Sequence, residues 1–198
     1  VLGKTSPHGV RTSLADHLGV DVFEVPMGPP SLPGIRLEDR LYEALDAAGV
    51  SIETGNPVVD FDASGGAVDR VYVERSGNRV PYAASEFVLA TGGLVGKGID
   101  SDRAGVREPI FDCHVAHPAD RYEWFDDDAF GDHRFARFGV DVDHELQPRD
   151  AAGDPEFRNL RAAGSVLGNY DFAAEKSGSG VSLATGHRAG RLAGVAAG

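Results

Sequence analysis

The sequence is poor in cysteine, because Cys113 is the only one among its 198 residues. A single thiol excludes an internal disulfide framework and is typical of a protein in a reducing compartment. The sequence also lacks an apolar run long enough to cross a bilayer, and no positively charged start precedes an apolar signal core. These absences predict a cytoplasmic protein and leave open a peripheral association with the inner face of the cell membrane through partners.

Methionine is equally rare. The chain begins at Val1, and Met27 is its only methionine. This start indicates a fragment or a processed chain.

Positive charge is scarce as well. The chain carries 31 acidic against 19 basic residues, a formal net charge of −12, and its only lysines are Lys4, Lys97 and Lys176. Such a surface repels nucleic-acid phosphates, so nucleic acid is not expected as a partner. Because salt screens self-repulsion, an acidic, lysine-poor composition favours a high-salt cytoplasm and predicts a halophilic archaeal source. An ordinary acidic protein is the alternative.

Two helices are predicted near the beginning of the chain. Residues 11–20 read as a short helix that ends at Gly19. Residues 21–34 read as an extended piece and a proline-rich loop, because each proline fixes its own φ and restricts its predecessor. From Ile35 a second helix runs to Gly49. Its apolar face consists of Leu37, Leu41, Ala44, Leu45 and Ala48.

Short strands follow. The stretches "VSIETG", "PVVDFDA", "AVDRVYVER" and "RVPYAA" are separated by turn residues, which predicts a β-meander. The continuous apolar run Phe87–Ala90 predicts a strand buried on both faces. It leads to Gly92 and Gly93, where the absence of a Cβ lets the chain pass close to a ligand.

The remaining sequence divides into an irregular and a regular part. Residues 94–157 carry aromatics, histidines and prolines without a long periodic segment, which favours a cap over a ligand cleft or a plain loop-rich subdomain. Order returns with a strand that runs into Gly164 and with the last helix, which a glycine turn opens. We therefore predict three parts: 1–93, 94–157 and 158–198, of which the first and last belong to one cofactor-binding domain.

Two buried strands thus end in glycines, and both ends are expected to face one ligand, as at the switch point of an open α/β sheet. The phosphate-binding pattern Gly-x-Gly-x-x-Gly after a first strand is absent, because "GLVGKG" and "GSGVSLATG" both have the wrong spacing. The sequence therefore predicts an α/β fold, with an α+β appearance, that lacks the element that grips a pyrophosphate.

Five stretches together carry a family resemblance: "PPSLPGIRL", "FVLATGGLVGKGI", "GVREPIFD", "NLRAAGSVLGNYD" and "SGSGVSLATG". The chain resembles the carboxy-terminal half to two-thirds of the B-subunit family of anaerobic glycerol-3-phosphate dehydrogenases, which are flavin-dependent oxidoreductases. This resemblance implies an incomplete FAD/NAD(P)-binding Rossmann-like domain with FAD or FMN as its cofactor. Relatives often have a cysteine where this chain has Ser177, so no thiol is expected to act there.

The resemblance also implies the cofactor residues. The amides of Gly178, Ser179, Gly180 and Val181 would face the pyrimidine end of the flavin ring, where free N–H groups and the helix dipole stabilise negative charge. The two strand ends, Gly92 with Gly93 and Gly164 with Ser165, complete the expected set. Flavoproteins commonly place an acidic residue at the second strand end, and Ser165 offers only a hydroxyl. The alternative is that "GSGV" only begins a structural helix.

On the substrate side, oxidation of glycerol phosphate needs a cation for the phosphate and a base for the hydroxyl proton. Arg107 is the predicted cation, because its planar fork suits phosphate oxygens, and a salt bridge with Glu108 or another acid is the alternative. His114 is the predicted base, with His117 as a second candidate and a surface or core role as the alternative.

No metal is expected. The segment "CHVAH" supplies one cysteine and two histidines, which leaves a zinc ion without a fourth ligand. The acidic run 126–128 lacks the alternating ligand spacing of a calcium loop.

The resemblance implies a subunit that passes electrons from glycerol 3-phosphate oxidation, with dihydroxyacetone phosphate as product, toward a membrane quinone. Its expected partners are a catalytic dehydrogenase subunit and an iron–sulfur subunit, and the isolated chain is expected to be inactive. Two alternatives stay open: a flavin oxidoreductase of another substrate, and a non-catalytic docking module on a flavoprotein scaffold.

Overall fold

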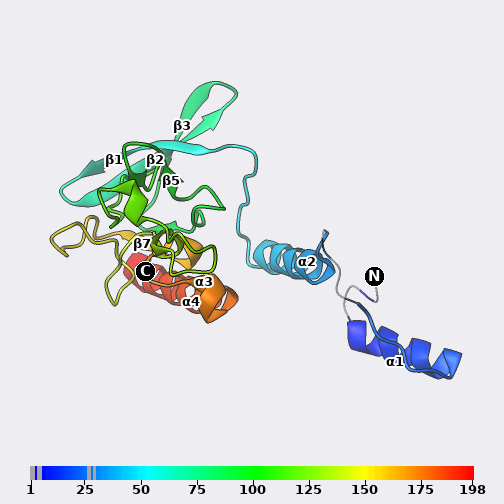
Figure 1. Cartoon of the computed structure of the whole chain (residues 1–198). Coiled ribbons are helices and arrows are strands. Elements are labelled where there is room, and N and C mark those ends of the chain that lie inside the picture. The colour runs from blue at the N-terminus through cyan, green and yellow to red at the C-terminus, as the bar shows by residue number, and fades with distance from the viewer. Residues whose placement is uncertain (1–2, 4–5, 26–27, 29) are drawn as a thin grey trace. The chain divides into compact units, whose positions relative to one another are not determined.

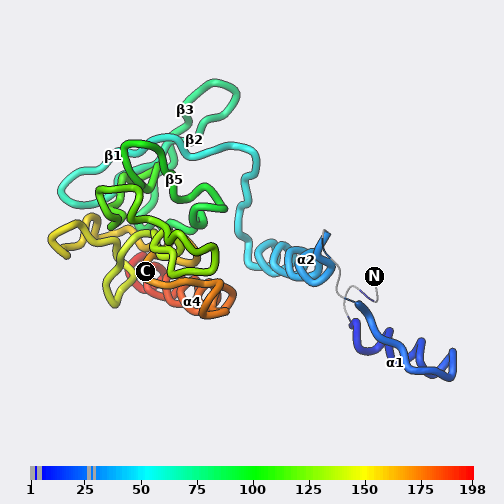
Figure 2. Tube along the Cα trace, viewed as in Figure 1, coloured from blue at the N-terminus to red at the C-terminus, as the bar shows by residue number. Residues whose placement is uncertain are grey.

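The computed structural model describes residues 3, 6–25, 28 and 30–198. The chain forms two compact units, Val1–Gly55 and Asn56–Gly198, and each is described by itself (Figure 2). Residues 26, 27 and 29 of the expected proline-rich loop lie outside the described residues, and so does Lys4.

Helix α1, Pro7–Leu18, confirms the first predicted helix. The Ser6 hydroxyl accepts the N–H of Gly9, and Pro7 occupies the first turn, where a missing N–H costs nothing. Gly19 ends the helix at φ 66°, the left-handed conformation that glycine adopts readily. The helix begins earlier than predicted because Ser6 and Pro7 set its first turn.

Helix α2, Leu32–Ala47, confirms the second predicted helix and extends it toward the amino terminus. Ser31 caps it by accepting the N–H of Gly34, so the prediction of a loop over residues 32–34 was wrong. The predicted apolar face is real but not packed: none of the described residues of this unit is buried, and Leu41 keeps 52% of its surface exposed.

The second unit opens with the predicted meander. Strands β1 (Val58–Ser64), β2 (Ala67–Arg75) and β3 (Asn78–Ala83) form an antiparallel sheet in that order. Tight turns with positive φ at Gly65–Gly66 and Ser76–Gly77 join them, as two-residue hairpin turns require. Segment 50–55, "VSIETG", is not a strand, because no strand of the described chain pairs with it.

Strands β4 (Phe87–Leu89) and β7 (Leu160–Ala162) pair in parallel although far apart in sequence. β7 is buried throughout, whereas β4 is buried on one face only, since Val88 is 44% exposed and Leu89 is 3% exposed. The prediction that β4 is buried on both faces was therefore wrong. Helix α4, Gly178–Ala197, packs against both strands and lies beside β7 in Figure 1.

Between β4 and β7 the chain is irregular, as predicted. It holds the small hairpin β5 (Asp100–Ser101) and β6 (Val106–Arg107) and the short 3-10 helices η1 (Arg121–Glu123) and η2 (Arg134–Arg137). After β7 come the 3-10 turn η3, Gly164–Val166, and the one-turn helix α3, Phe172–Glu175. The assignment of 94–157 to a cap and of the remainder to one domain stays a prediction.

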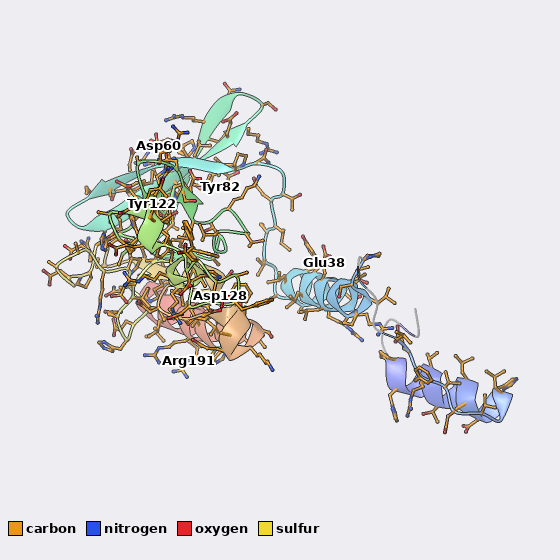
Figure 3. The ribbon with its side chains drawn as sticks, in the orientation of Figure 1. Glu38, Asp60, Tyr82, Tyr122, Asp128 and Arg191 are labelled. Carbon is orange, nitrogen blue, oxygen red and sulfur yellow. The ribbon has the colours of Figure 1, made fainter. Side chains whose placement is uncertain are left out.

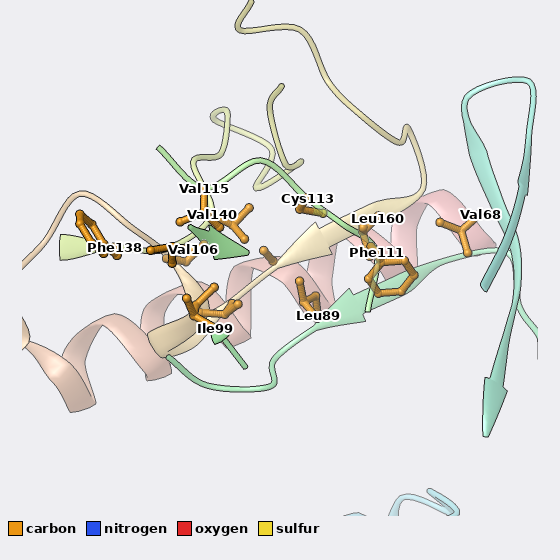
Figure 4. Packing of buried hydrophobic residues seen from close by; sticks show 13 residues of the cluster. Val68, Leu89, Ile99, Val106, Phe111, Cys113, Val115, Phe138, Val140 and Leu160 are labelled. Carbon is orange, nitrogen blue, oxygen red and sulfur yellow. The ribbon is translucent and has the colours of Figure 1, made fainter. Parts of the chain in front are cut away.

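A single large core joins these pieces of the second unit (Figure 4). Leu89 and Leu160 from the parallel strands pack with Ile99 and Phe111 from the irregular segment. Since each buried aliphatic or aromatic side chain contributes about 1.5–3 kcal/mol, the irregular segment is held mainly by its apolar anchors. Many charged side chains lie at the surface, among them the exposed Glu38 on α2 and Asp128 (Figure 3), whereas Glu108 and Arg161 are buried.

Candidate functional site

The ends of β4 and β7 and the start of α4 enclose a cavity of about 550 Å³, here called the strand-end cavity. Its lining combines glycines, apolar side chains and a few polar groups. The lining residues are Gly93, Leu94, Val95, Gly96, His133, Phe135, Ala136, Phe138, Ser165, Leu167, Tyr170, Asp171, Phe172, Ala173, Gly178 and Ser182. Of the eight predicted cofactor residues, Gly93, Ser165 and Gly178 line this cavity.

The two strand ends approach each other through backbone atoms. A Cβ on Gly93 would lie 2.6 Å from the Ser165 carbonyl oxygen, so only glycine fits there. Gly92 has φ 89°, which favours glycine, and a Cβ at this position would lie 3.8 Å from the Ser165 hydroxyl. Gly93 is thus required by the contact with the end of β7, and Gly92 is favoured by its backbone conformation.

The start of α4 presents open amides. The first helical bond runs from the Val181 N–H to the Ser177 carbonyl, so the amides of Gly178, Ser179 and Gly180 have no acceptor within the helix. The Ser177 side chain does not cap them and instead donates to Glu175. Such amides, with the positive end of the helix dipole, favour negative charge.

The other predicted cofactor residues after β7 and on α4 lie outside the cavity lining. Gly164 has φ 79°, and its N–H donates to the Thr185 hydroxyl at 2.9 Å, which ties the end of β7 to α4. Val181 packs its side chain against the core. Ser179 and Gly180 are exposed.

Tyr170 and Asp171 line the cavity, and the sequence patterns assigned them no role. The Tyr170 hydroxyl is buried and has no hydrogen-bond partner among the described residues. Burial, with a smaller effect from Glu175, raises the pKa of Tyr170, so the hydroxyl stays a donor. Asp171 caps α3 by accepting the N–H groups of Ala173 and Ala174. Both residues lie in "NLRAAGSVLGNYD", one of the stretches that carry the family resemblance. That location is the only feature of the sequence that could have pointed to them.

A second cavity of about 870 Å³, here called the aromatic cavity, adjoins the first. The two share the walls formed by Leu94, Phe135 and Phe138. Its full lining is Leu94, Lys97, Ile99, Asp100, Ser101, Pro109, Trp124, Phe125, Phe135 and Phe138. The Trp124 ring meets Phe138 edge-on, and its indole N–H donates to the Pro118 carbonyl, which fixes this wall.

Arg107 lines neither cavity. Its guanidinium forms ion pairs with Asp100 at 2.7 Å and Asp102 at 3.3 Å. The structure thus shows the salt-bridge alternative, with two neighbouring acids in place of Glu108. Two backbone amides, followed by Arg107, lower the pKa of Asp102.

The two candidate histidines also lie away from the cavity linings. The backbone N–H of His114 donates to Glu156 at 2.7 Å. His117 is held at both ring nitrogens: Nδ1 lies 2.7 Å from the Val115 carbonyl, and Nε2 accepts the Val106 N–H at 3.2 Å. This pattern requires the neutral ring with its proton on Nδ1, which is a structural role. The assignment of His114 as the base stays a prediction.

The same irregular segment contains a buried acidic group. Glu108 is fully buried, and its carboxylate accepts the N–H groups of Ile110 and Phe111. Burial raises the pKa of Glu108, and the bound amides partly offset this effect. Burial also raises the pKa of the Cys113 thiol far above its usual range, so this thiol is not reactive. In the described ranges no three His, Cys, Asp or Glu side chains gather closely enough to hold a metal ion.

The strand-end cavity fits a flavin ring. Its walls are largely apolar, its glycines admit close approach, the open amides of α4 suit an electron-rich edge, and the Tyr170 hydroxyl offers an unused donor. Gly93, Ser165, Gly178 and Tyr170 are the residues that would hold it. The sequence lacks the Gly-x-Gly-x-x-Gly pattern that binds a pyrophosphate.

These features define a flavoprotein of the Rossmann-like class. The chain belongs to the FAD binding domain family, which it matches over residues 1–181. It is 68% identical over 98% of its length to a Halobacterium salinarum protein named as the B subunit of a probable anaerobic glycerol-3-phosphate dehydrogenase, of which it covers 45%. The B subunits of the anaerobic glycerol-3-phosphate dehydrogenases of Vibrio cholerae and Yersinia enterocolitica are 32% and 31% identical over 84% of the chain, which covers 38% of each.

The chain therefore spans less than half the length of the curated relatives it matches. These similarities confirm the predicted family resemblance, the α/β FAD-binding class and the flavin cofactor. The Halobacterium relative agrees with the predicted halophilic character. No solved structure matches the chain. Among the described helices, none is long and apolar enough to span a bilayer.

Proposed function

We propose that this chain supplies part of the flavin site of a glycerol-3-phosphate dehydrogenase complex. The observation that carries the proposal is the strand-end cavity, where two glycine-ended parallel strands meet the open start of a helix. The names of the relatives supply the substrate. When bound, flavin accepts the two electrons that leave glycerol 3-phosphate as its secondary alcohol becomes the ketone of dihydroxyacetone phosphate.

The residues of the chain bind the flavin and orient it. The amides at the start of α4 stabilise negative charge on the bound ring, and the Tyr170 hydroxyl donates a hydrogen bond to it. The phenylalanines shared by the two cavities exclude water from the space between cofactor and substrate. Neither Arg107 nor His114 is required for these roles.

The protein works in a complex that passes the electrons onward to a membrane quinone. A catalytic dehydrogenase subunit and an iron–sulfur subunit are the proposed partners, and they would hold the complex at the inner face of the cell membrane from the cytoplasmic side. In such a complex this chain either takes part in oxidising the substrate or relays its electrons.

The visible spectrum of the protein purified from its own cells, with its partners, tests the proposal. A flavin band that bleaches when glycerol 3-phosphate is added supports it, and glycerol is the control that lacks the phosphate. A flavin band that stays unchanged would assign another substrate. A preparation without flavin would leave the docking module as the better account.

A further inference from the structure

The lining of the aromatic cavity is largely apolar. Only Lys97 and Asp100 among its lining residues carry a charge, and Ser101 adds a hydroxyl. Four aromatic rings also line it, those of Trp124, Phe125, Phe135 and Phe138. A ligand in this cavity would meet both charged groups and aromatic rings.

Asp100, the only acid among the lining residues of the aromatic cavity, already has an ionic partner. Asp100 pairs with Arg107 at 2.7 Å, and the same guanidinium also reaches Asp102. Lys97, in contrast, forms no ion pair with any described residue. The Lys97 ammonium is therefore the charged group of the cavity lining that has no ionic partner among the described residues.

A strained turn holds Lys97 in place. Its φ is 63°, a left-handed conformation that an L side chain rarely adopts. The next residue, Gly98, is packed so tightly that a Cβ on it would lie 2.0 Å from the Gly92 carbonyl oxygen, and its N–H donates to the Gly93 carbonyl at 3.1 Å. The turn that carries the lysine is thus anchored to Gly92 and Gly93, the two glycines that follow β4.

We propose that Lys97 binds the phosphate group of a small organic phosphate, whose carbon end lies against the aromatic wall beside the strand-end cavity. A compact ammonium with three donors suits a phosphate, and the contact is charge-assisted. Arg107 is a positioning residue here, because it keeps Asp100 from neutralising the lysine. The identity of the ligand as glycerol 3-phosphate rests on the proposed function, whereas the contact with the phosphate rests on the geometry of the cavity.

Binding of glycerol 3-phosphate and of inorganic phosphate to the flavin-loaded protein, measured by calorimetry, tests the proposal without turnover. Lys97→Gln is expected to weaken both at least tenfold, and Lys97→Arg is expected to restore most of the loss. Lys176→Gln removes the same charge at an exposed left-handed position that lines neither cavity, so it should leave binding unchanged.

The role of Arg107 has its own test. Arg107→Gln leaves Asp100 uncompensated and is expected to weaken phosphate binding several-fold. Adding Asp100→Asn removes the cavity-lining acid that Arg107 neutralises and restores the net charge of the group, so the double variant should bind phosphate as the unchanged protein does. A double variant as weak as Arg107→Gln would assign Arg107 a direct contact and overturn its positioning role.

The outcomes separate this proposal from the proposed function. If glycerol 3-phosphate binds through Lys97 without bleaching the flavin, the dehydrogenase assignment fails and the phosphate contact stands. If Lys97→Gln loses flavin while the remaining loaded protein binds phosphate normally, the lysine holds a phosphate of the cofactor, and the proposal is overturned. Equal phosphate binding by Lys97→Gln and the unchanged protein, or none by either, also overturns it.

Discussion

The side-chain amide of Asn159 pairs with both backbone groups of Val68, 91 residues away. Its Oδ1 accepts the Val68 N–H at 2.8 Å, and its Nδ2 donates to the Val68 carbonyl at 2.8 Å and to the Ser85 carbonyl at 3.1 Å. One asparagine thus joins the meander to the parallel strands at a buried position, as a short piece of strand would.

Loss of this amide should weaken the whole second unit. Asn159→Ala leaves buried backbone groups without partners, so we expect the free energy of unfolding to fall by about 2–4 kcal/mol. Denaturant titration of the protein at constant salt measures the effect. Asn78→Ala, at an exposed position of β3, is the matched control and should change stability by less than about 0.5 kcal/mol. Equal effects of the two variants would contradict the role of Asn159.

Substitution by alanine is expected to have opposite effects at Gly139 and Gly186. A Cβ on Gly139 would lie 2.4 Å from the Gly168 nitrogen, whereas a Cβ on Gly186, exposed on α4, would meet nothing within 4 Å. Gly139→Ala should therefore lower the melting temperature markedly, at a cost of several kcal/mol. Gly186→Ala should raise stability by about 0.5–1 kcal/mol, because alanine favours the helix. Tolerance of alanine at 139 would show that these backbones do not cross so closely.

Stability should depend on pH through Glu108. Because its pKa is raised in the folded state, the folded protein binds more protons than the unfolded chain between the unfolded and folded pKa values. This contribution to stability is greatest below about pH 4.3 and falls as pH rises toward the folded pKa. Glu108→Gln should remove this falling component when unfolding is followed from pH 4 upward.

Glu74→Gln, on the exposed side of β2, removes an acid without disturbing a buried group and is the control for that titration. A stability difference between the unchanged protein and Glu108→Gln that stays constant with pH would contradict the raised pKa.

Tyr170 should matter for the cofactor and not for the fold. Its buried hydroxyl has no partner among the described residues, so Tyr170→Phe should leave the free energy of unfolding equal or slightly higher in the absence of flavin. The same change should weaken flavin binding about five- to tenfold, because one hydrogen bond to the ligand is lost. Tyr122→Phe, 68% exposed, is the matched control. Unchanged flavin affinity in Tyr170→Phe, measured by quenching of flavin fluorescence, would place the hydroxyl outside the site.

The 198-residue chain by itself should bind flavin at least 100-fold more weakly than the full-length Halobacterium salinarum relative. The physical reason is that the glycine pattern that binds a pyrophosphate is absent from it, while the strand-end cavity would hold only the ring. Equilibrium dialysis with FAD at matched salt measures both affinities. Comparable affinities would show that the chain contains a complete flavin site.

Local rules of the sequence determined the elements. The glycine at 19, the apolar spacing of α2, the alternation in β2 and the glycine turn before α4 each depend on neighbours along the chain, so they could be predicted. One error was local, because the Ser31 cap starts α2 within the predicted loop. The errors in the strands fell where a neighbour distant in sequence decides. Val88 is exposed although its run is apolar, and segment 50–55 finds no partner strand.

The candidate site divides in the same way. Glycines and serines at the strand ends could be predicted because close backbone approach demands small residues, and Gly93, Ser165 and Gly178 do line one cavity. Only the tertiary structure decided which charged groups line the neighbouring aromatic cavity. It paired Arg107 with Asp100 and brought Lys97 to a wall of aromatic rings, because side-chain partners depend on packing between segments that the sequence order does not place together.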